Sequence, residues 1–230
     1  MIIAIIPARS GSKRIKKKNI KLFYKKPIIS YPIIALKKSK IFDKIIVSSD
    51  SEFVGKIAKK NGVDFYKRSK KLSGDKVPTR DVILDVINWL KKKLITPTFV
   101  CCIYPTTPLI TALDLKKTYK LIKSQKKGYI FSAIKNSYPI QRTFFFDNIK
   151  GIRMINEKNY FKRSQEFQET FHDAGQFYWA HSQTWEKQKI IFTKNSKIYL
   201  LPLNKAHDID TYDDWKLVQK FYKMQNPKKN

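Results

Sequence analysis

A short basic segment near the start of the chain has the residue types to hold phosphate groups. Residues 7–19 read PARSGSKRIKKKN and follow an apolar run. Small residues let backbone N–H groups approach an anion, and the basic side chains can neutralise several phosphate charges. The segment has neither the Walker A spacing nor the GxGxxG pattern, and from charge alone a generic basic loop is an equally good interpretation. Its position after the first predicted strand favours phosphate, because open α/β sheets bind ligands beyond the carboxyl ends of their strands.

A pair of carboxylates near the other end of the chain is the second candidate for chemistry. Asp208 and Asp210 flank Ile209 between a predicted strand and the last predicted helix. Alternate residues of an extended segment point the same way, so both carboxylates can face one site while Ile209 packs inward. Such a pair beside bound phosphates suits Mg²⁺, which takes only one or two protein carboxylates. Helix capping by Asp210 or Thr211 is the competing interpretation; it explains one aspartate better than two, and both interpretations stay open here.

Hydrophobic periodicity predicts the elements that must position these segments. Apolar runs predict strands at residues 2–6, 44–48, 63–66, 98–103, 129–134, 176–180 and 198–203, and helical spacing predicts helices at 28–38, 51–61, 79–92, 112–123 and 211–224. Strands and helices alternate with short connections, which is typical of an α/β fold with a doubly wound, mostly parallel sheet. We expect a kink at Pro32, and a buried face on the helix at 51–61 that includes Phe53.

The alternation of strands and helices fails between residues 136 and 170. Aromatic and polar residues are mixed there, as in Phe144-Phe145-Phe146. We interpret this segment as an inserted hairpin or an oligomer arm within a single domain that spans residues 1–230.

The net charge of +30, from 48 basic and 18 acidic residues, at first indicates a nucleic-acid-binding module. However, only seven of the basic residues are arginines, and the lysines are scattered through every predicted helix and turn. Because a charge run is usually a solvated face, we interpret most lysines as background composition and expect no nucleic-acid partner. The arginines are more informative, since a guanidinium binds carboxylates and phosphates bidentately.

Hydropathy and the cysteines indicate where the protein works. The longest apolar runs are far shorter than the roughly 18 residues that a membrane span needs, and the start of the chain is apolar first and basic second, the reverse of a secretory signal. Cys101 and Cys102 are adjacent in an apolar stretch, where we expect buried free thiols. The sequence therefore predicts a cytoplasmic protein with no membrane partner.

Four motifs together resemble the CMP-sialic acid synthetase family, the cytidylyltransferases that activate nine-carbon acidic sugars. They are IIPARSGSKRIKKKNI at residues 5–20, SSD at 48–50, PTTPL at 105–109 and HDIDT at 207–211. The first and last are specific, whereas the middle two are weak alone. The stretch FHDAGQFYW at 171–179 favours the pseudaminic acid branch, because Ala174 stands where sialic acid enzymes generally have Asn.

The resemblance implies a Rossmann-like nucleotidyltransferase fold of three layers and a homodimer in which residues 136–170 form the dimerisation arm. It implies that CMP passes from CTP to the anomeric hydroxyl of a nonulosonic acid, pseudaminic acid, with Mg²⁺ present and pyrophosphate released. Legionaminic or N-acetylneuraminic acid is the alternative sugar. N-acetylneuraminic acid is less favoured, because Tyr104 and Ile110 stand where sialic acid enzymes commonly have Gln and Arg.

The same resemblance carries functional roles to matching positions. Catalytic roles fall on Arg9, Lys18, Asp208 and Asp210, and the two aspartates would also hold Mg²⁺. CTP would be bound by Arg9, Ser12, Lys13, Lys18, Asn19, Arg68 and Thr79. The sugar would be contacted by Tyr104, Arg163, His172 and Gln176. Arg163 is the expected clamp for the sugar carboxylate, while a satisfied, partly buried histidine is the competing interpretation of His172.

Overall fold

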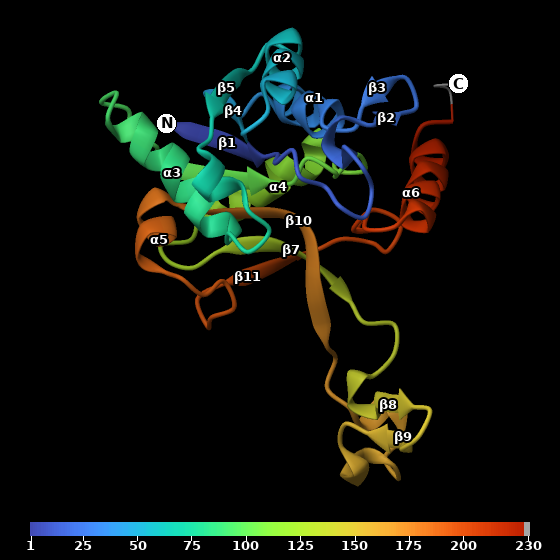
Figure 1. Ribbon diagram of the computed structural model, residues 1–230. Helices are drawn as coiled ribbons and strands as arrows, with labels where there is room; N and C mark the ends of the chain where they lie inside the picture. Colours follow the sequence, from blue (N-terminus) through green and yellow to red (C-terminus); the bar gives the residue numbers. More distant parts are fainter. Residues whose placement is uncertain (228–230) are drawn as a thin grey trace.

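A seven-stranded, mostly parallel sheet forms the centre of the protein (Figure 1). The computed structural model describes residues 1–227. The sheet contains β1 (Ile2–Pro7), β4 (Lys44–Ser49), β5 (Asp64–Lys67), β6 (Phe99–Ile103), β7 (Ile130–Lys135), β10 (Phe171–His181) and β11 (Lys197–Leu200). Their order is β11-β7-β10-β6-β1-β4-β5. Only β10 is antiparallel to its neighbours, so the mostly parallel sheet expected from the sequence is confirmed.

Helices cover both faces of this sheet. They are α1 (Ser30–Ser39), α2 (Glu52–Lys60), α3 (Thr79–Lys91), α4 (Ala112–Lys123) and α5 (Ser182–Lys187). A further helix, α6 (Tyr212–Gln225), lies beside the sheet. On one face, Ala4 and Ile6 pack with buried residues of α1, α2 and α4. On the other face, Ile3 and Ile5 pack with α3 and α5, because alternate strand residues point to opposite sides. The protein therefore has three layers, α/β/α, as Figure 1 shows.

Two neighbouring cysteines show the same alternation. Cys101 lies in one core and Cys102 in the other, and both are buried and free. This confirms the thiols expected from the sequence. None of the helices in residues 1–227 is long and apolar enough to cross a bilayer.

One local expectation for the helices was wrong, and another has no basis in the position of the residue concerned. Phe53 is 59% exposed, because α2 turns Val54, Gly55 and Ala58 toward the sheet and Gly55 lies directly against the ring of Phe65. Pro32 lies in the first turn of α1, where the missing N–H costs no helical hydrogen bond, so the expected kink has no cause there.

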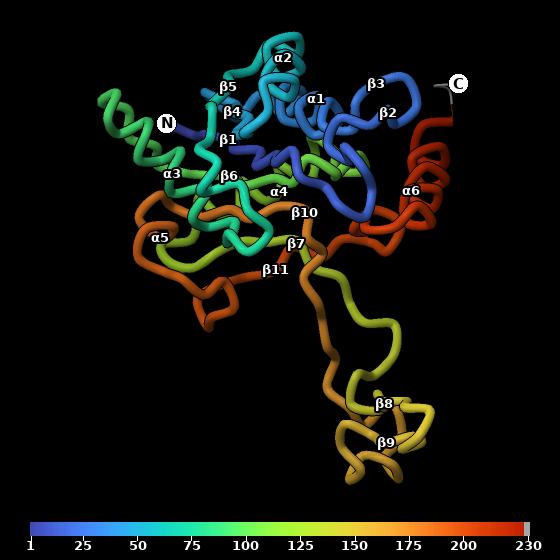
Figure 2. Tube along the Cα trace, in the orientation of Figure 1, coloured from blue at the N-terminus to red at the C-terminus, as the bar shows by residue number. Residues whose placement is uncertain are grey.

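The segment from 136 to 170 leaves the sheet as a projecting arm. Figure 2 traces the chain out of β7 and back into β10, with β8 (Phe144–Asp147) and β9 (Gly151–Met154) paired at the far end. Of the two sequence interpretations, the structure shows a hairpin inserted between two sheet strands, so β10 begins earlier than the predicted strand at 176–180.

A third hydrophobic cluster fixes the segments that carry the candidate chemistry. Ile15 from the basic segment, Leu109 from the PTTPL turn and Ile209 from between the two aspartates are all buried together. They pack against Trp215 and Val218 of α6 and against the small hairpin of β2 (Leu22–Phe23) and β3 (Lys26–Pro27). The burial of Ile209 confirms the expected alternation around Asp208 and Asp210.

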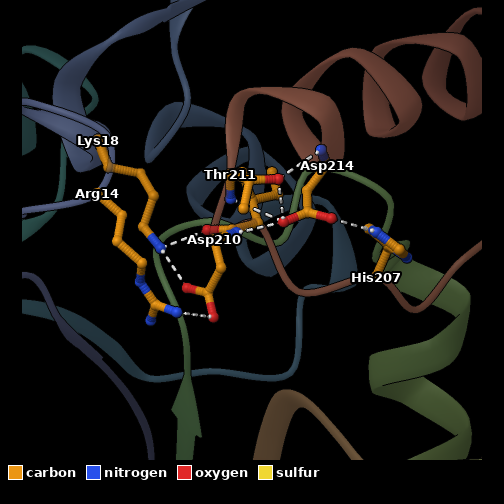
Figure 3. Close-up of polar contacts among 7 residues, drawn as sticks. Arg14, Lys18, His207, Asp210, Thr211 and Asp214 are labelled. Atoms are coloured by element: carbon orange, nitrogen blue, oxygen red, sulfur yellow. Dashed lines mark hydrogen bonds and ion pairs between the residues drawn. The ribbon is translucent and has the colours of Figure 1, made fainter. Parts of the chain in front are cut away.

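Thr211 and Asp214 cap α6 in a reciprocal capping box. The Asp214 carboxylate accepts hydrogen bonds from the backbone N–H groups of Asp210 (3.0 Å) and Thr211 (2.7 Å), and it contacts His207 Nε2 at 3.0 Å (Figure 3). Desolvation would raise the pKa of Asp214, yet the bonds from Thr211 outweigh it and hold that pKa well below its ordinary value. Because Thr211 is the cap, the Asp210 side chain is left for another role.

We expect Asp214→Ala to lower the free energy of unfolding by about 1–2 kcal/mol at neutral pH, because α6 loses its cap. Since the folded-state pKa of Asp214 is depressed, this stabilisation is present above the ordinary carboxyl pKa and disappears as the pH falls toward the folded-state value. Urea unfolding over a pH series measures it. The control is Asp213→Ala, whose side chain is 93% exposed. Equal losses in the two variants would contradict the role given to the cap.

Candidate active site

A cavity of about 590 Å³ lies beyond the carboxyl ends of the central strands. Its walls come from the segments that follow β1, β5 and β6 and from residues 208–210. This is where open α/β sheets bind ligands. The residues predicted for the nucleotide and the metal all line it, together with one residue predicted for the sugar: Arg9, Ser12, Lys13, Lys18, Asn19, Arg68, Thr79, Asp208, Asp210 and Tyr104.

The basic loop of residues 7–19 is held in place by the side chains of Asn19 and Asp50. The buried amide of Asn19 donates to the carbonyl oxygen of Arg9 at 2.8 Å. Asp50, which follows β4, accepts from the backbone N–H of Ser10 at 2.9 Å and from its hydroxyl at 2.5 Å. Desolvation raises the pKa of Asp50, but the hydrogen bonds from Ser10 and the nearby charge of Arg68 lower it overall. The carboxylate therefore stays ionised and keeps the loop oriented.

Arg68 is a buried guanidinium with unused donors. Its side chain lines the cavity, and the residue is only 4% exposed. Within residues 1–227, its Nε and Nη2 atoms are buried without a hydrogen-bond partner. Burial lowers the pKa of Arg68, while the charges of Asp50 and Asp85 act in the opposite direction. A buried cation with unsatisfied donors is costly, so its position on a cavity wall indicates a ligand that offers acceptor atoms.

The two aspartates of the HDIDT motif face the cavity with different partners. The Asp210 carboxylate pairs with Arg14 at 2.8 Å and with Lys18 at 3.4 Å, and Lys18 also donates to the carbonyl of Ile209 (Figure 3). Within residues 1–227, Asp208 makes no ion pair. Asp208 is exposed to solvent, but neighbouring protein atoms partly desolvate its carboxylate, and this desolvation and then the charge of Asp210 raise its pKa. Two neighbouring carboxylates repel each other, and a bound cation would relieve that repulsion.

The carboxylates of Asp208 and Asp210 are side-chain ligands that the cavity could offer to a metal ion. In the described part of the chain, no cluster of three or more His, Cys, Asp or Glu side chains is arranged to hold a metal. The protein therefore offers two carboxylates, Asp208 and Asp210, and substrate oxygens and water would supply the remaining ligands. That donor set fits Mg²⁺, which is commonly held by one or two carboxylates and phosphate groups.

Tyr104 and Thr79 form another part of the cavity wall. The hydroxyl of Thr79, at the start of α3, lies 3.0 Å from the hydroxyl of Tyr104. The Tyr104 ring packs edge-on against Tyr178, whose hydroxyl donates to Asp173 at 2.6 Å. Burial raises the pKa of Tyr104 to about 12, so the phenol stays neutral and can donate a hydrogen bond.

Three residues predicted to contact the sugar do not line this cavity. Gln176 is buried, and its amide donates to the carbonyl of Ala174 at 2.7 Å. His172 lies where β10 leaves the arm and contacts Asn136 at 2.7 Å. Arg163 belongs to the arm, which projects away from the sheet (Figure 1), and its backbone N–H donates to Glu166. Within one chain, the structure does not bring these residues to the other predicted site residues.

Sequence reasoning missed two aspartates of the site. Asp50 was part of a motif but had no assigned role, and Asp75 was not singled out. Asp75 lines the cavity and forms ion pairs with Arg9 and Lys13. The available signal was an acidic residue in a lysine-rich loop of a chain with few acidic residues. That signal does not identify the partners, which lie more than 60 residues away in the sequence.

Comparison with known proteins gives consistent matches. Residues 3–223 match the family model described as cytidylyltransferase. A pseudaminic acid cytidylyltransferase of Campylobacter jejuni is 40% identical over 224 residues, covering 96% of either chain. An N-acylneuraminate cytidylyltransferase of Escherichia coli is 28% identical, covering 99% of this chain and 54% of its own length.

Solved structures agree with the fold. CMP:2-keto-3-deoxy-manno-octonic acid synthetase complexed with CTP has a TM-score of 0.70 at 12% identity, covering 97% of this chain and 99% of its own. 4-Diphosphocytidyl-2C-methyl-D-erythritol synthase from Anaerococcus prevotii has a TM-score of 0.61 at 14% identity, covering 96% and 97%. At these identities the likeness shows the fold alone, and it confirms the expected Rossmann-like nucleotidyltransferase fold.

Proposed function

The chain belongs to the cytidylyltransferase family, and we propose that it transfers CMP from CTP to the anomeric hydroxyl of pseudaminic acid, releasing pyrophosphate. The 40% identity to a pseudaminic acid cytidylyltransferase along almost the whole chain supports this sugar. The structural observation that carries the proposal is the buried, unpartnered guanidinium of Arg68 in a cavity that also contains a basic loop and two carboxylates. Such a cavity suits a nucleoside triphosphate.

The cavity divides naturally between the two ends of CTP. The unused donors of Arg68 match the O2 and N3 acceptors of cytosine, with the Thr79 hydroxyl nearby. The triphosphate would lie along the basic loop, against Arg9, Lys13 and Lys18 and within reach of the Ser12 hydroxyl. Asn19 contributes by holding the backbone of that loop, since its amide is already bound to the Arg9 carbonyl.

Asp208 and Asp210 would hold Mg²⁺ beside the phosphates, as their donor set allows. When bound there, Mg²⁺ neutralises charge that builds on phosphate oxygens during transfer. Arg14 and Lys18, which pair with Asp210, would then remain close enough to face the phosphates themselves.

The reaction joins the anomeric oxygen to the α-phosphorus and breaks the bond between that phosphorus and the bridging oxygen to the β-phosphate. Pyrophosphate leaves with that oxygen, and a carboxylate of the Asp208–Asp210 pair accepts the proton of the sugar hydroxyl. Charge develops on the phosphoryl oxygens and on the leaving group, so fixed cations such as Arg9 and Lys18 stabilise the transition state. Tyr104 offers a neutral hydroxyl to the bound substrates.

The arm supports a homodimer as the working form in the cytoplasm. In the single chain, many of its large apolar residues are exposed: Tyr138, Ile140, Phe144, Phe145, Phe146, Ile149, Ile152, Ile155, Tyr160 and Phe161. An apolar surface of this extent normally meets a partner. A second copy would cover it, and the arm would carry Arg163, with His172 at its base, toward the sugar at the neighbouring site.

The substrate assignment is tested by pyrophosphate release from CTP and Mg²⁺ with pseudaminic, legionaminic, N-acetylneuraminic and 3-deoxy-octulosonic acids. We expect the highest kcat/KM with pseudaminic acid and background rates without Mg²⁺. UTP is the matched control, because the N3–H of uracil would meet the donors of Arg68; we expect at least about tenfold lower kcat/KM. No turnover with any of the four sugars would refute the function.

The role of Arg68 is tested by Arg68→Met, which keeps the volume and removes the donors. We expect CTP to bind about 10–100-fold more weakly, because hydrogen bonds from a charged group are lost. The ligand-free variant should melt no lower than the native protein, because a buried cation without a full set of partners is gone.

The matched control for Arg68→Met is Arg80→Met. Arg80 donates to the carbonyls of Trp185 (2.9 Å) and Glu186 (2.5 Å) and serves the fold. The variant Arg80→Met should therefore be less stable than the native protein and bind CTP with unchanged affinity. Titration calorimetry and thermal melting measure both quantities, and unchanged CTP affinity in Arg68→Met would contradict the assignment.

The dimer is tested by light scattering on the native protein and on Phe146→Asp. We expect a mass of two chains for the native protein and of one chain for the variant at micromolar concentration, because a carboxylate would have to be desolvated in the interface. Phe146 is 70% exposed in the single chain, so the variant should still fold. Leu94→Asp, at a residue 96% exposed outside the arm, should remain dimeric. A native protein with the mass of one chain would overturn the proposed assembly.

A further inference from the structure

Asp75 occupies an unexpected place in the anion site. It lies in the loop between β5 and α3, and its carboxylate pairs with both the guanidinium of Arg9 and the ammonium of Lys13. These cations belong to the loop that follows β1, which lines the same cavity. The role of Asp75 rests on the proposed function, since Arg9 and Lys13 are the cations that would meet the triphosphate.

Nothing else in the fold needs this carboxylate. Within residues 1–227, its only hydrogen-bond or ion-pair partners are those two cations. Two nearby aspartates have contacts beyond the cations, because Asp50 orients the loop through Ser10 and Asp210 is anchored by its backbone to Asp214. Asp75 is also not part of any cluster of three potential metal ligands in these residues. Its side chain is 40% exposed, so it can leave its partners without unfolding a core.

Arg9 and Lys13 repel each other, and a counter-ion lowers that cost while the site is empty. A carboxylate carries one negative charge on two oxygens, whereas a triphosphate carries several charges on many oxygens. A polyphosphate can therefore replace the carboxylate at both cations, while an anion of low charge competes poorly. The same exchange acts in reverse when pyrophosphate leaves after the reaction.

We propose that Asp75 is an internal counter-ion that takes the place of substrate phosphate oxygens at Arg9 and Lys13 and is displaced when they bind. It sets the affinity of the loop for polyphosphates and returns to the two cations as pyrophosphate departs. Asp75 thus tunes binding and product release by acting on Arg9 and Lys13, without contacting the reacting atoms.

The test is binding of inorganic pyrophosphate and tripolyphosphate to the full-length protein by titration calorimetry. We expect Asp75→Asn to bind both about 3–10-fold more tightly than the native protein, the range for two partly exposed ion pairs. In turnover assays, pyrophosphate should inhibit Asp75→Asn more strongly by the same factor. The gain should shrink at high salt, where the ion pairs in the native protein are already screened.

Two further variants make the outcome decisive. Asp81→Asn, in α3, makes the same change of net charge at a side chain that is 47% exposed and does not pair with the loop cations. It should leave polyphosphate affinity within about twofold, and Asp75→Glu should do the same because the charge is kept. Equal or weaker binding by Asp75→Asn, or an equal gain in Asp81→Asn, would overturn the role of Asp75. Because the probes are inorganic anions, the binding result stands even if CTP proves not to be the substrate.

Discussion

Repulsion among cations is the constraint on which the active site depends. Arg9, Lys13, Arg14, Lys18 and Arg68 all line one cavity of about 590 Å³, where like charges close together repel one another. Carboxylates from other segments lie next to these cations. Asp75 pairs with Arg9 and Lys13. Asp210 pairs with Arg14 and Lys18, and Asp50 lies near Arg68. Among the described residues that line the cavity, the Arg68 side chain keeps buried donors without a partner. Asp75 and Asp210 each carry one negative charge beside two cations, so the cavity keeps a net positive charge that suits an anionic ligand.

Apolar packing makes this arrangement of charges possible. Ile15, Leu109 and Ile209 are buried in one cluster although they come from three separate segments. Each sits next to polar residues of the site, so burying the apolar side chain turns its neighbours toward the cavity. The capping box of α6 adds a second restraint, since Asp214 binds the backbone N–H of Asp210. The positions of the charged side chains are therefore determined by the hydrophobic contacts of their sequence neighbours. These contacts do not depend on pH.

The sequence predicted those parts of the protein that depend on local pattern. It correctly placed the basic loop after the first strand, Ile209 in the core, a helix at 112–123 and the two cysteines on opposite faces of a strand. A spacing of two, or of three to four, residues decides which side a residue faces. The predicted burial of Phe53 was wrong because Gly55 lets α2 approach Phe65 closely. A periodicity that counts only large apolar residues overlooks a glycine. The pairing of Asp75 with Arg9 was missed because it joins residues 66 positions apart. Periodicity carries no information about such contacts.

The charge of +30 acquires a specific meaning once these contacts are known. Scattered lysines give the surface a positive field that raises the encounter rate of any anion, including both proposed substrates. Such a field does not discriminate, and a cavity with bare cations would fill with whichever anion is abundant. Carboxylates inside the cavity remove that weakness, because an entering ligand must replace Asp75 at two cations and must also satisfy the donors of Arg68. The unselective attraction on the surface and the selective exchange in the site are therefore complementary. The excess of lysine is compatible with specificity only because some of the few acidic residues are placed where the substrate binds.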